Sequence, residues 1–141
     1  MNMHAANASV YKQQQILTAS PEQLILMLYN GCIKFMNEAA NAIEVKDLEK
    51  THNTCIKAQN IVLELSSTLN MDYPIAKEMF LLYDYVEHEL ILANLKKDVQ
   101  HIENAKYVLN NIREGWMDAM KTARVQSAAS YSQTTGGAIS I

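Results

Sequence analysis

The stretch that decides the fold reads Thr18-Ala19-Ser20-Pro21-Glu22-Gln23-Leu24-Ile25-Leu26-Met27-Leu28-Tyr29. Its first half is typical of a helix start: Ser20 suits the N-cap, Pro21 the first helical position, and Gln23 completes a capping box. Its second half, residues 24–29, is apolar without interruption. A helix that packs on one side needs only one apolar stripe, so this helix has more apolar surface than a single neighbour can cover.

Two explanations fit this excess of apolar surface. The helix can lie at the centre of the fold and contact every other helix, which is what the pattern alone favours. Alternatively, part of the helix faces a partner protein. Tyrosines on several predicted helices support a partner surface to some degree, because a ring with a polar tip suits half-exposed grooves.

The remainder of the chain also has a helical pattern. Apolar residues recur at helical spacing in four segments, separated by short connections near residues 45–46, 70–73 and 95–97. Short connections between long helices place neighbours antiparallel. We therefore predict an all-α fold, an antiparallel up-down-up-down four-helix bundle formed by residues 20–125.

The two flanks differ from this bundle. Residues 1–19 are mostly polar and lack a clear period, which predicts an irregular, flexible N-terminal segment. Residues 126–141 are rich in Ser, Thr, Ala and Gly, which predicts a disordered tail.

Composition excludes several classes of protein. The net charge is −3 and no run of Lys and Arg occurs, so nucleic acid is not an expected partner. The longest apolar run, residues 24–29, is far shorter than the roughly 20 residues that cross a bilayer, so no membrane insertion is expected. The N-terminus does not resemble a secretory signal. Cys32 and Cys55 sit at apolar helical positions and suggest buried thiols in a reducing compartment, which predicts a cytoplasmic protein.

The sequence offers little catalytic chemistry. Glu49 and His52 match the Glu-x-x-His spacing of di-iron bundles once. Asp98 and His101 have the same spacing, with Asp in place of Glu, and are a weaker match. Both pairs fall in first helical turns, where acidic residues are favoured by the helix dipole. We predict no catalytic, cofactor or metal site. A metal-dependent bundle enzyme using Glu49, His52 and His101 stays open as one alternative, and a self-associating structural bundle as another.

Several segments together resemble the FliS family of flagellin export chaperones. The first is Thr18 to Gly31, with Ser20-Pro21 followed by Leu24-Ile25 and Met27-Leu28-Tyr29-Asn30-Gly31. The others follow in order along the chain: Lys57-Ala58-Gln59-Asn60-Ile61-Val62, Leu82-Tyr83-Asp84-Tyr85, Leu92-Ala93-Asn94 with Asp98, and Trp116. The resemblance spans about residues 11–120.

This resemblance implies a helical bundle without catalytic activity. It implies a cytoplasmic chaperone that binds the disordered C-terminal region of flagellin, prevents premature polymerisation and supports delivery to components of the flagellar type III export gate. It also implies that the N-terminal segment, with its tyrosine at Tyr11, folds back over the binding surface. Residues 1–19 would then compete with flagellin, so truncation before Ser20 is expected to tighten flagellin binding.

A flagellin groove should be long and apolar, because ordering a disordered segment costs about 1–2 kcal/mol per residue. The residues that we expect to form it come from three predicted helices and the N-terminal segment, although most of them suit the bundle interior equally well. They are Tyr11, Leu24, Ile25, Leu28, Tyr29, Ile61, Leu65, Tyr83 and Val86.

Overall fold

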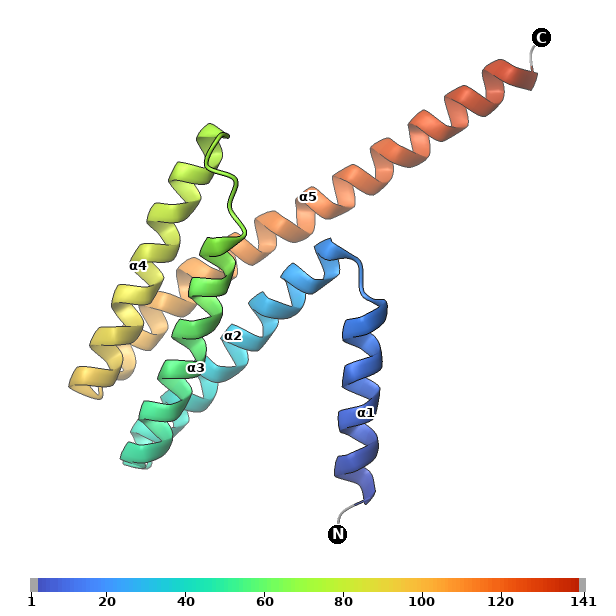
Figure 1. Cartoon of the computed structure of the whole chain (residues 1–141). Coiled ribbons are helices and arrows are strands. Elements are labelled where there is room, and N and C mark those ends of the chain that lie inside the picture. The colour runs from blue at the N-terminus through green and yellow to red at the C-terminus, as the bar shows by residue number, and fades with distance from the viewer. Residues whose placement is uncertain (1–2, 140–141) are drawn as a thin grey trace.

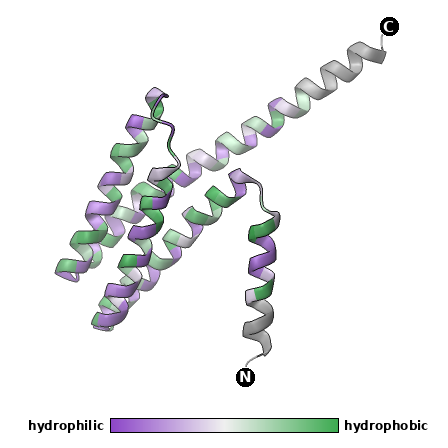
Figure 2. Cartoon of the chain, in the orientation of Figure 1, coloured by the Kyte–Doolittle hydropathy of each residue, from purple (hydrophilic) through white to green (hydrophobic). Residues whose placement is uncertain are grey.

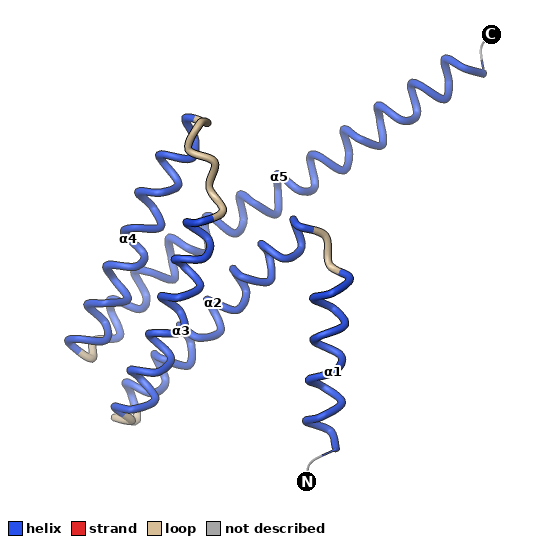
Figure 3. The backbone as a smooth tube through the Cα atoms, viewed as in Figure 1, coloured by secondary structure: helices blue, strands red, loops and turns tan. Residues whose placement is uncertain are grey.

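A computed structural model describes the backbone of residues 3–139 and the side chains of residues 9–129. Five helices follow one another in the chain, and no strand occurs between residues 3 and 139 (Figures 1 and 3). The helices are α1 (Met3–Thr18), α2 (Pro21–Glu44), α3 (Leu48–Ser67), α4 (Pro74–Lys96) and α5 (Val99–Ile139).

Helices α2 to α5 form an antiparallel four-helix bundle, as predicted. α2 packs against α3 and α5, and α4 also packs against α3 and α5, so the four helices surround one core. Figure 1 shows α1 outside this bundle and the last part of α5 extending beyond it. None of the helices in the described part of the chain is both long enough and apolar enough to cross a membrane.

Side chains fix the starts of the bundle helices as the sequence indicates. The Gln23 backbone N–H donates to the Ser20 hydroxyl oxygen at 3.2 Å, and the Ser20 N–H donates to Gln23 Oε1 at 3.0 Å, which completes the predicted capping box. At the start of α3, the Lys50 N–H donates to Asp47 Oδ1 at 3.0 Å. These bonds satisfy backbone donors that have no partner within their own helix.

The backbone of both flanks differs from the pattern that we expected. Residues 3–18 are helical rather than irregular, and α5 continues past residue 125 through Ile139. Neither flank contains proline, and Ala and Gln are frequent in residues 1–19, so local propensity permits a helical backbone there. The flexibility of residues 1–19 and the disorder of residues 126–141 stay predictions. The periodic apolar stripe that we used as the criterion reports packing against a core, and α1 has no such packing.

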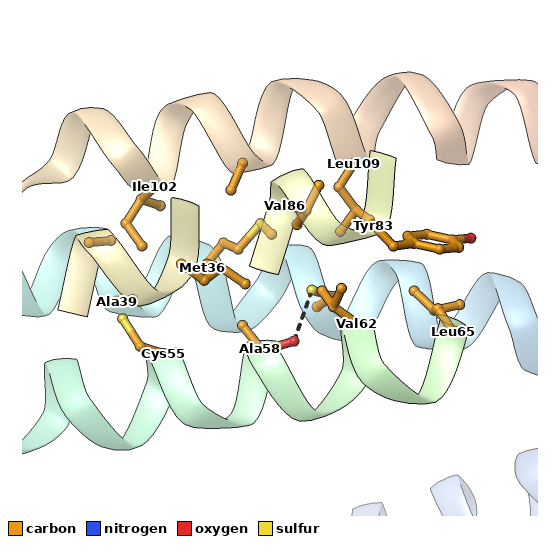
Figure 4. Close-up of a cluster of buried hydrophobic side chains, with 14 of the residues drawn as sticks. Met36, Ala39, Cys55, Ala58, Val62, Leu65, Tyr83, Val86, Ile102 and Leu109 are labelled. Atoms are coloured by element: carbon orange, nitrogen blue, oxygen red, sulfur yellow. Dashed lines mark hydrogen bonds between the residues drawn. The ribbon is translucent and has the colours of Figure 1, made fainter. Parts of the chain in front are cut away.

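The core lies along the axis of the bundle (Figure 4). Its members come from all four bundle helices and have almost no exposed surface, and the Cys32 thiol donates to the Ala58 carbonyl at 3.5 Å. They are Tyr29, Cys32, Met36, Ala39, Cys55, Ala58, Val62, Leu65, Tyr83, Val86, Leu90, Ala93, Ile102, Ala105, Leu109 and Ile112.

The bundle has two different ends. We call the end with the α2–α3 and α4–α5 turns the closed end, and the end where α2 and α4 begin and α3 stops the open end. Figure 3 shows a longer loop at the open end, between α3 and α4, and short turns at the closed end. Lys46 and Lys97 give the short turns their left-handed backbone, with φ of 60° and 52°.

Candidate partner-binding site

The open end contains a cavity of about 920 Å³. All four bundle helices and the α3–α4 loop contribute to its wall. The lining residues are Ile25 and Tyr29 from α2, Thr68, Leu69, Asn70 and Tyr73 from the end of α3 and the loop, Ile75, Ala76, Met79, Leu82 and Tyr83 from α4, and Val108, Asn111, Ile112, Gly115, Trp116 and Ala119 from α5.

Small side chains keep this cavity open. Ala76, Gly115 and Ala119 occupy lining positions where a larger residue would fill the space. A Cβ atom added at Gly115 would meet no atom within 4 Å. The volume is at the upper end of the range for ligand-binding pockets.

Among the residues whose side chains the structure describes, none that lines the cavity is charged. Its polar residues Thr68, Asn70 and Asn111 are exposed, where water can satisfy them. Tyr29 and Tyr83 are instead 2% exposed, and their hydroxyl oxygens lie 2.5 Å apart in a hydrogen bond. Such a wall favours an apolar, uncharged occupant.

Burial determines the ionisation of the tyrosine pair. Burial raises the pKa of Tyr29, and the hydrogen bond from Tyr83 partly offsets this rise. Burial, the hydrogen bond with Tyr29 and the charge that Tyr29 would carry all raise the pKa of Tyr83. Both phenols are therefore neutral at physiological pH and both keep their protons.

Two side chains of α5 hold the open end together across the gap to α2. The Trp116 indole Nε1 donates to the Glu22 carbonyl at 3.2 Å, and Arg113 Nη1 donates to Asn30 Oδ1 at 2.8 Å. Trp116 is also part of the cavity wall, which makes it a reporter of what the cavity contains.

The structure brings three of the predicted groove residues together: Ile25, Tyr29 and Tyr83 line the cavity. Leu28 and Ile61 are partly buried against the core and do not line it. Leu24 is 36% exposed on the outside of α2. The uninterrupted apolar stretch of residues 24–29 is thus divided among the core, the cavity wall and the outer surface of α2.

Two predicted groove residues are fully buried. Leu65 and Val86 have no exposed surface and lie inside the bundle. Helical spacing identifies a stripe of apolar residues, but it does not distinguish a stripe facing the core from one facing a groove. In this conformation neither residue offers surface to a partner.

Tyr11 lies on α1 and is 63% exposed. Over residues 9–18, the part of α1 whose side chains the structure describes, no residue lines the cavity, and this part is not packed along any bundle helix. The competition between residues 1–19 and flagellin stays a prediction.

Sequence reasoning missed most of the cavity wall. Met79, Leu82, Ile112 and Trp116 all line the cavity, and none of them was among the predicted groove residues. One feature of the sequence could have indicated the cavity: small residues occur among these large ones on the same two helices. They are Ala76 on α4 and Gly115 and Ala119 on α5. Large residues that face small ones leave unfilled volume when the helices are held apart.

The histidines of the alternative metal site have other roles. Asn94 Nδ2 donates to His52 Nδ1 at 2.9 Å, and His101 pairs with Glu89 Oε2 at 2.7 Å. Over the residues that the structure describes, no three of His, Cys, Asp and Glu gather as a potential metal site. Glu49, His52 and His101 therefore do not form the ligand set that this alternative needs.

Comparison with known proteins identifies the family. The family model described as flagellar protein FliS matches residues 2–123. The flagellar secretion chaperone FliS of Bacillus subtilis (strain 168) is 40% identical over 116 residues, covering 82% of this chain and 87% of that protein. The FliS of Salmonella typhimurium (strain LT2) is 32% identical over 126 residues, covering 87% of this chain and 93% of that protein.

A solved structure has the same fold. It is titled "Crystal structure of flagellar chaperone from bacteria", has a TM-score of 0.67 and 20% sequence identity, and matches 82% of this chain and 98% of its own. This shared fold agrees with the four-helix bundle. The chain therefore belongs to the FliS family of flagellar proteins, whose relatives are secretion chaperones.

Proposed function

We propose that this chain is a cytoplasmic, non-enzymatic chaperone that binds the disordered C-terminal region of flagellin. In this role it prevents premature polymerisation and supports delivery to the flagellar type III export apparatus. Membership of a family of flagellar secretion chaperones supports the general role. The cavity at the open end carries the proposal for this chain in particular.

The cavity suits an apolar segment of a partner. Uncharged residues from four helices form its wall, and half-exposed apolar side chains such as Leu82 (40%) and Phe80 (45%) continue the apolar character along α4. Figure 2 shows hydrophobic residues along the whole length of α4. Helix-in-groove binding places the apolar face of a partner helix on a surface of this kind.

Energetics require more than the cavity alone. Ordering a disordered partner costs about 1–2 kcal/mol per residue, while burial returns about 25 cal/mol per Å² of apolar surface. A segment of tens of residues therefore needs an extended apolar surface. The cavity supplies the deepest anchoring point, and the half-exposed Phe80 and Leu82 of α4 extend the contact from it.

Co-expression tests the proposal. The chain and its cognate flagellin should form a soluble complex, and deletion of the flagellin C-terminal region should abolish it. A complex that survives this deletion unchanged would contradict the proposed mechanism. Light scattering of the free chain, over a range of concentrations, separates this function from the self-associating bundle that the sequence left open.

A further inference from the structure

The buried tyrosine pair is the one polar feature at the inner wall of the apolar cavity. Side chains on a helix lean toward the helix N-terminus, and both α2 and α4 begin at the open end. Tyr29 and Tyr83 therefore lean from opposite helices toward the cavity that they line. Figure 4 shows the Tyr83 hydroxyl pointing away from Met36, Ala39 and Cys55.

Counting protons shows that this pair is incomplete. Two neutral phenols have two O–H protons, and the single hydrogen bond between Tyr29 and Tyr83 uses one of them. Among the described residues, neither hydroxyl has another hydrogen-bond partner. One O–H proton therefore has no acceptor among these residues, and an apolar occupant that displaced water from the cavity would leave it unpaired, which is costly.

We propose that the Tyr29–Tyr83 pair selects the cargo segment, donating its free proton to a hydrogen-bond acceptor that enters the cavity among apolar side chains. This inference rests on the proposed function and deepens it. The occupant is an uncharged, mostly apolar segment of the partner that carries one acceptor, a side-chain amide or hydroxyl oxygen or a backbone carbonyl. The uncharged cavity wall is the reason to exclude a carboxylate or an ammonium group.

The pair adds selectivity that an apolar cavity lacks. An apolar cavity distinguishes ligands weakly, since each methylene group adds only a modest preference. A buried donor discriminates more strongly, because a purely apolar occupant leaves the donor unpaired. The free proton therefore favours one register of the cargo, the one that places an acceptor at the tyrosines.

The test uses the full chain and the Tyr29→Phe/Tyr83→Phe double variant. Phe has the same shape without the hydroxyl, so the cavity stays the same size. Binding of the C-terminal segment of the cognate flagellin, measured by calorimetry, should weaken about three- to tenfold, the amount that one hydrogen bond contributes. Tyr107→Phe is the matched control, because Tyr107 is 70% exposed on α5 and should leave affinity unchanged.

Stability of the free variant separates selection from a structural role. Removing both hydroxyls also removes the unpaired proton, so the unfolding midpoint of the double variant should stay equal or rise. Selection thus predicts weaker cargo binding without lower stability. A fall in both quantities would show that the pair only supports the fold, and unchanged or tighter binding would show that it selects nothing. Either result overturns the inference.

A second experiment tests the same inference without flagellin, by titrating the chain with two small ligands. Cyclohexanone and methylcyclohexane have similar size, and only the ketone has an acceptor. The single Trp in the chain gives one indole N–H resonance, and Trp116 lies in the cavity wall, so this resonance can follow both titrations. The preference of the wild type for the ketone should fall about three- to tenfold in the double variant.

The two arms make the failures distinguishable. If the wild type does not bind the flagellin segment, the proposed function fails, and the ketone preference still decides the inference. If the wild type binds flagellin but the ketone preference and the flagellin affinity are both unaffected by the double variant, only the inference fails.

Discussion

The two ends of the bundle are built from the same four helices but differ in how the interior is filled. At the closed end, Met36, Ala39, Cys55 and Ile102 have no exposed surface. At the open end, a cavity of about 920 Å³ remains between the helices. The closed end is therefore filled by packed side chains, whereas the open end keeps an unfilled apolar site.

Polar contacts join helices at both ends. Near the closed end, Asn94 connects to His52 and Lys97, and Glu89 accepts hydrogen bonds from His101 and Asn104, so α3, α4 and α5 are joined. At the open end, Trp116 and Arg113 join α5 to α2, and the Tyr29–Tyr83 hydrogen bond joins α2 to α4. The two ends therefore differ in how the interior is filled rather than in whether polar contacts connect their helices.

A matched pair of methionine substitutions should show the largest difference in stability. Met36 is fully buried near the closed end, whereas Met79 lines the cavity. Met36→Ala should lower the free energy of unfolding by about 2–5 kcal/mol, because it removes packed atoms and leaves a cavity. Met79→Ala should cost about 1 kcal/mol, because its side chain already borders empty space. Denaturant unfolding measures both, and equal losses would contradict the division into two ends.

A matched pair of aspartate substitutions should separate binding from stability. Leu82 lines the cavity. Leu81, its neighbour in α4, is 68% exposed and does not line the cavity. Leu82→Asp should weaken binding of the flagellin C-terminal segment at least tenfold, about 1.4 kcal/mol, because a carboxylate at an apolar wall must lose water when cargo binds.

Leu81→Asp is the control for this substitution and should change the affinity much less. Equal losses for the two variants, measured by calorimetry, would place the cargo on the outer surface of α4 rather than in the cavity.

Alkaline pH should reveal the burial of Cys32. Burial raises the pKa of the Cys32 thiol from its ordinary value of 9.0 to about 12. Above pH 9 the unfolded chain loses this proton while the folded chain keeps it, so stability is fully present below pH 9 and falls as pH rises. The slope approaches about 1.4 kcal/mol per pH unit for this one group. Unfolding of Cys32→Ala between pH 9 and pH 10.5 should show a shallower slope, and an identical slope would argue against the burial.

The smallest expected effect is a gain in stability. Gly115 lies within α5, and a Cβ atom there would meet nothing within 4 Å. Gly115→Ala should therefore stabilise the chain by about 0.5–1 kcal/mol, because alanine restricts the unfolded backbone without a steric cost. Thermal unfolding measures this change. A loss of stability would show that the open end has less space than the structure gives it.

Much of the bundle could be predicted from the sequence. The capping box at Ser20, the boundaries of the helices and the burial of Cys32 and Cys55 all follow from local patterns. The cavity could not be predicted in the same way. In the sequence, Ala76 indicates a helical position and Gly115 a flexible one. Only the packed structure shows that both residues border the same cavity.

The candidate site was predicted only in part for a related reason. Ile25, Tyr29 and Tyr83 all line the cavity, and their contact with a partner stays a prediction. Leu65 and Val86 have no exposed surface, because an apolar stripe at helical spacing is covered once four helices pack around it.

Trp116 gives the most direct test of the central claim, that the open end is where cargo binds. Titration of the full chain with the C-terminal segment of its cognate flagellin should change Trp116 fluorescence in proportion to the fraction bound, because Trp116 is the one Trp in the chain and lies in the cavity wall. Tight binding by calorimetry with no change in Trp116 fluorescence would contradict the account.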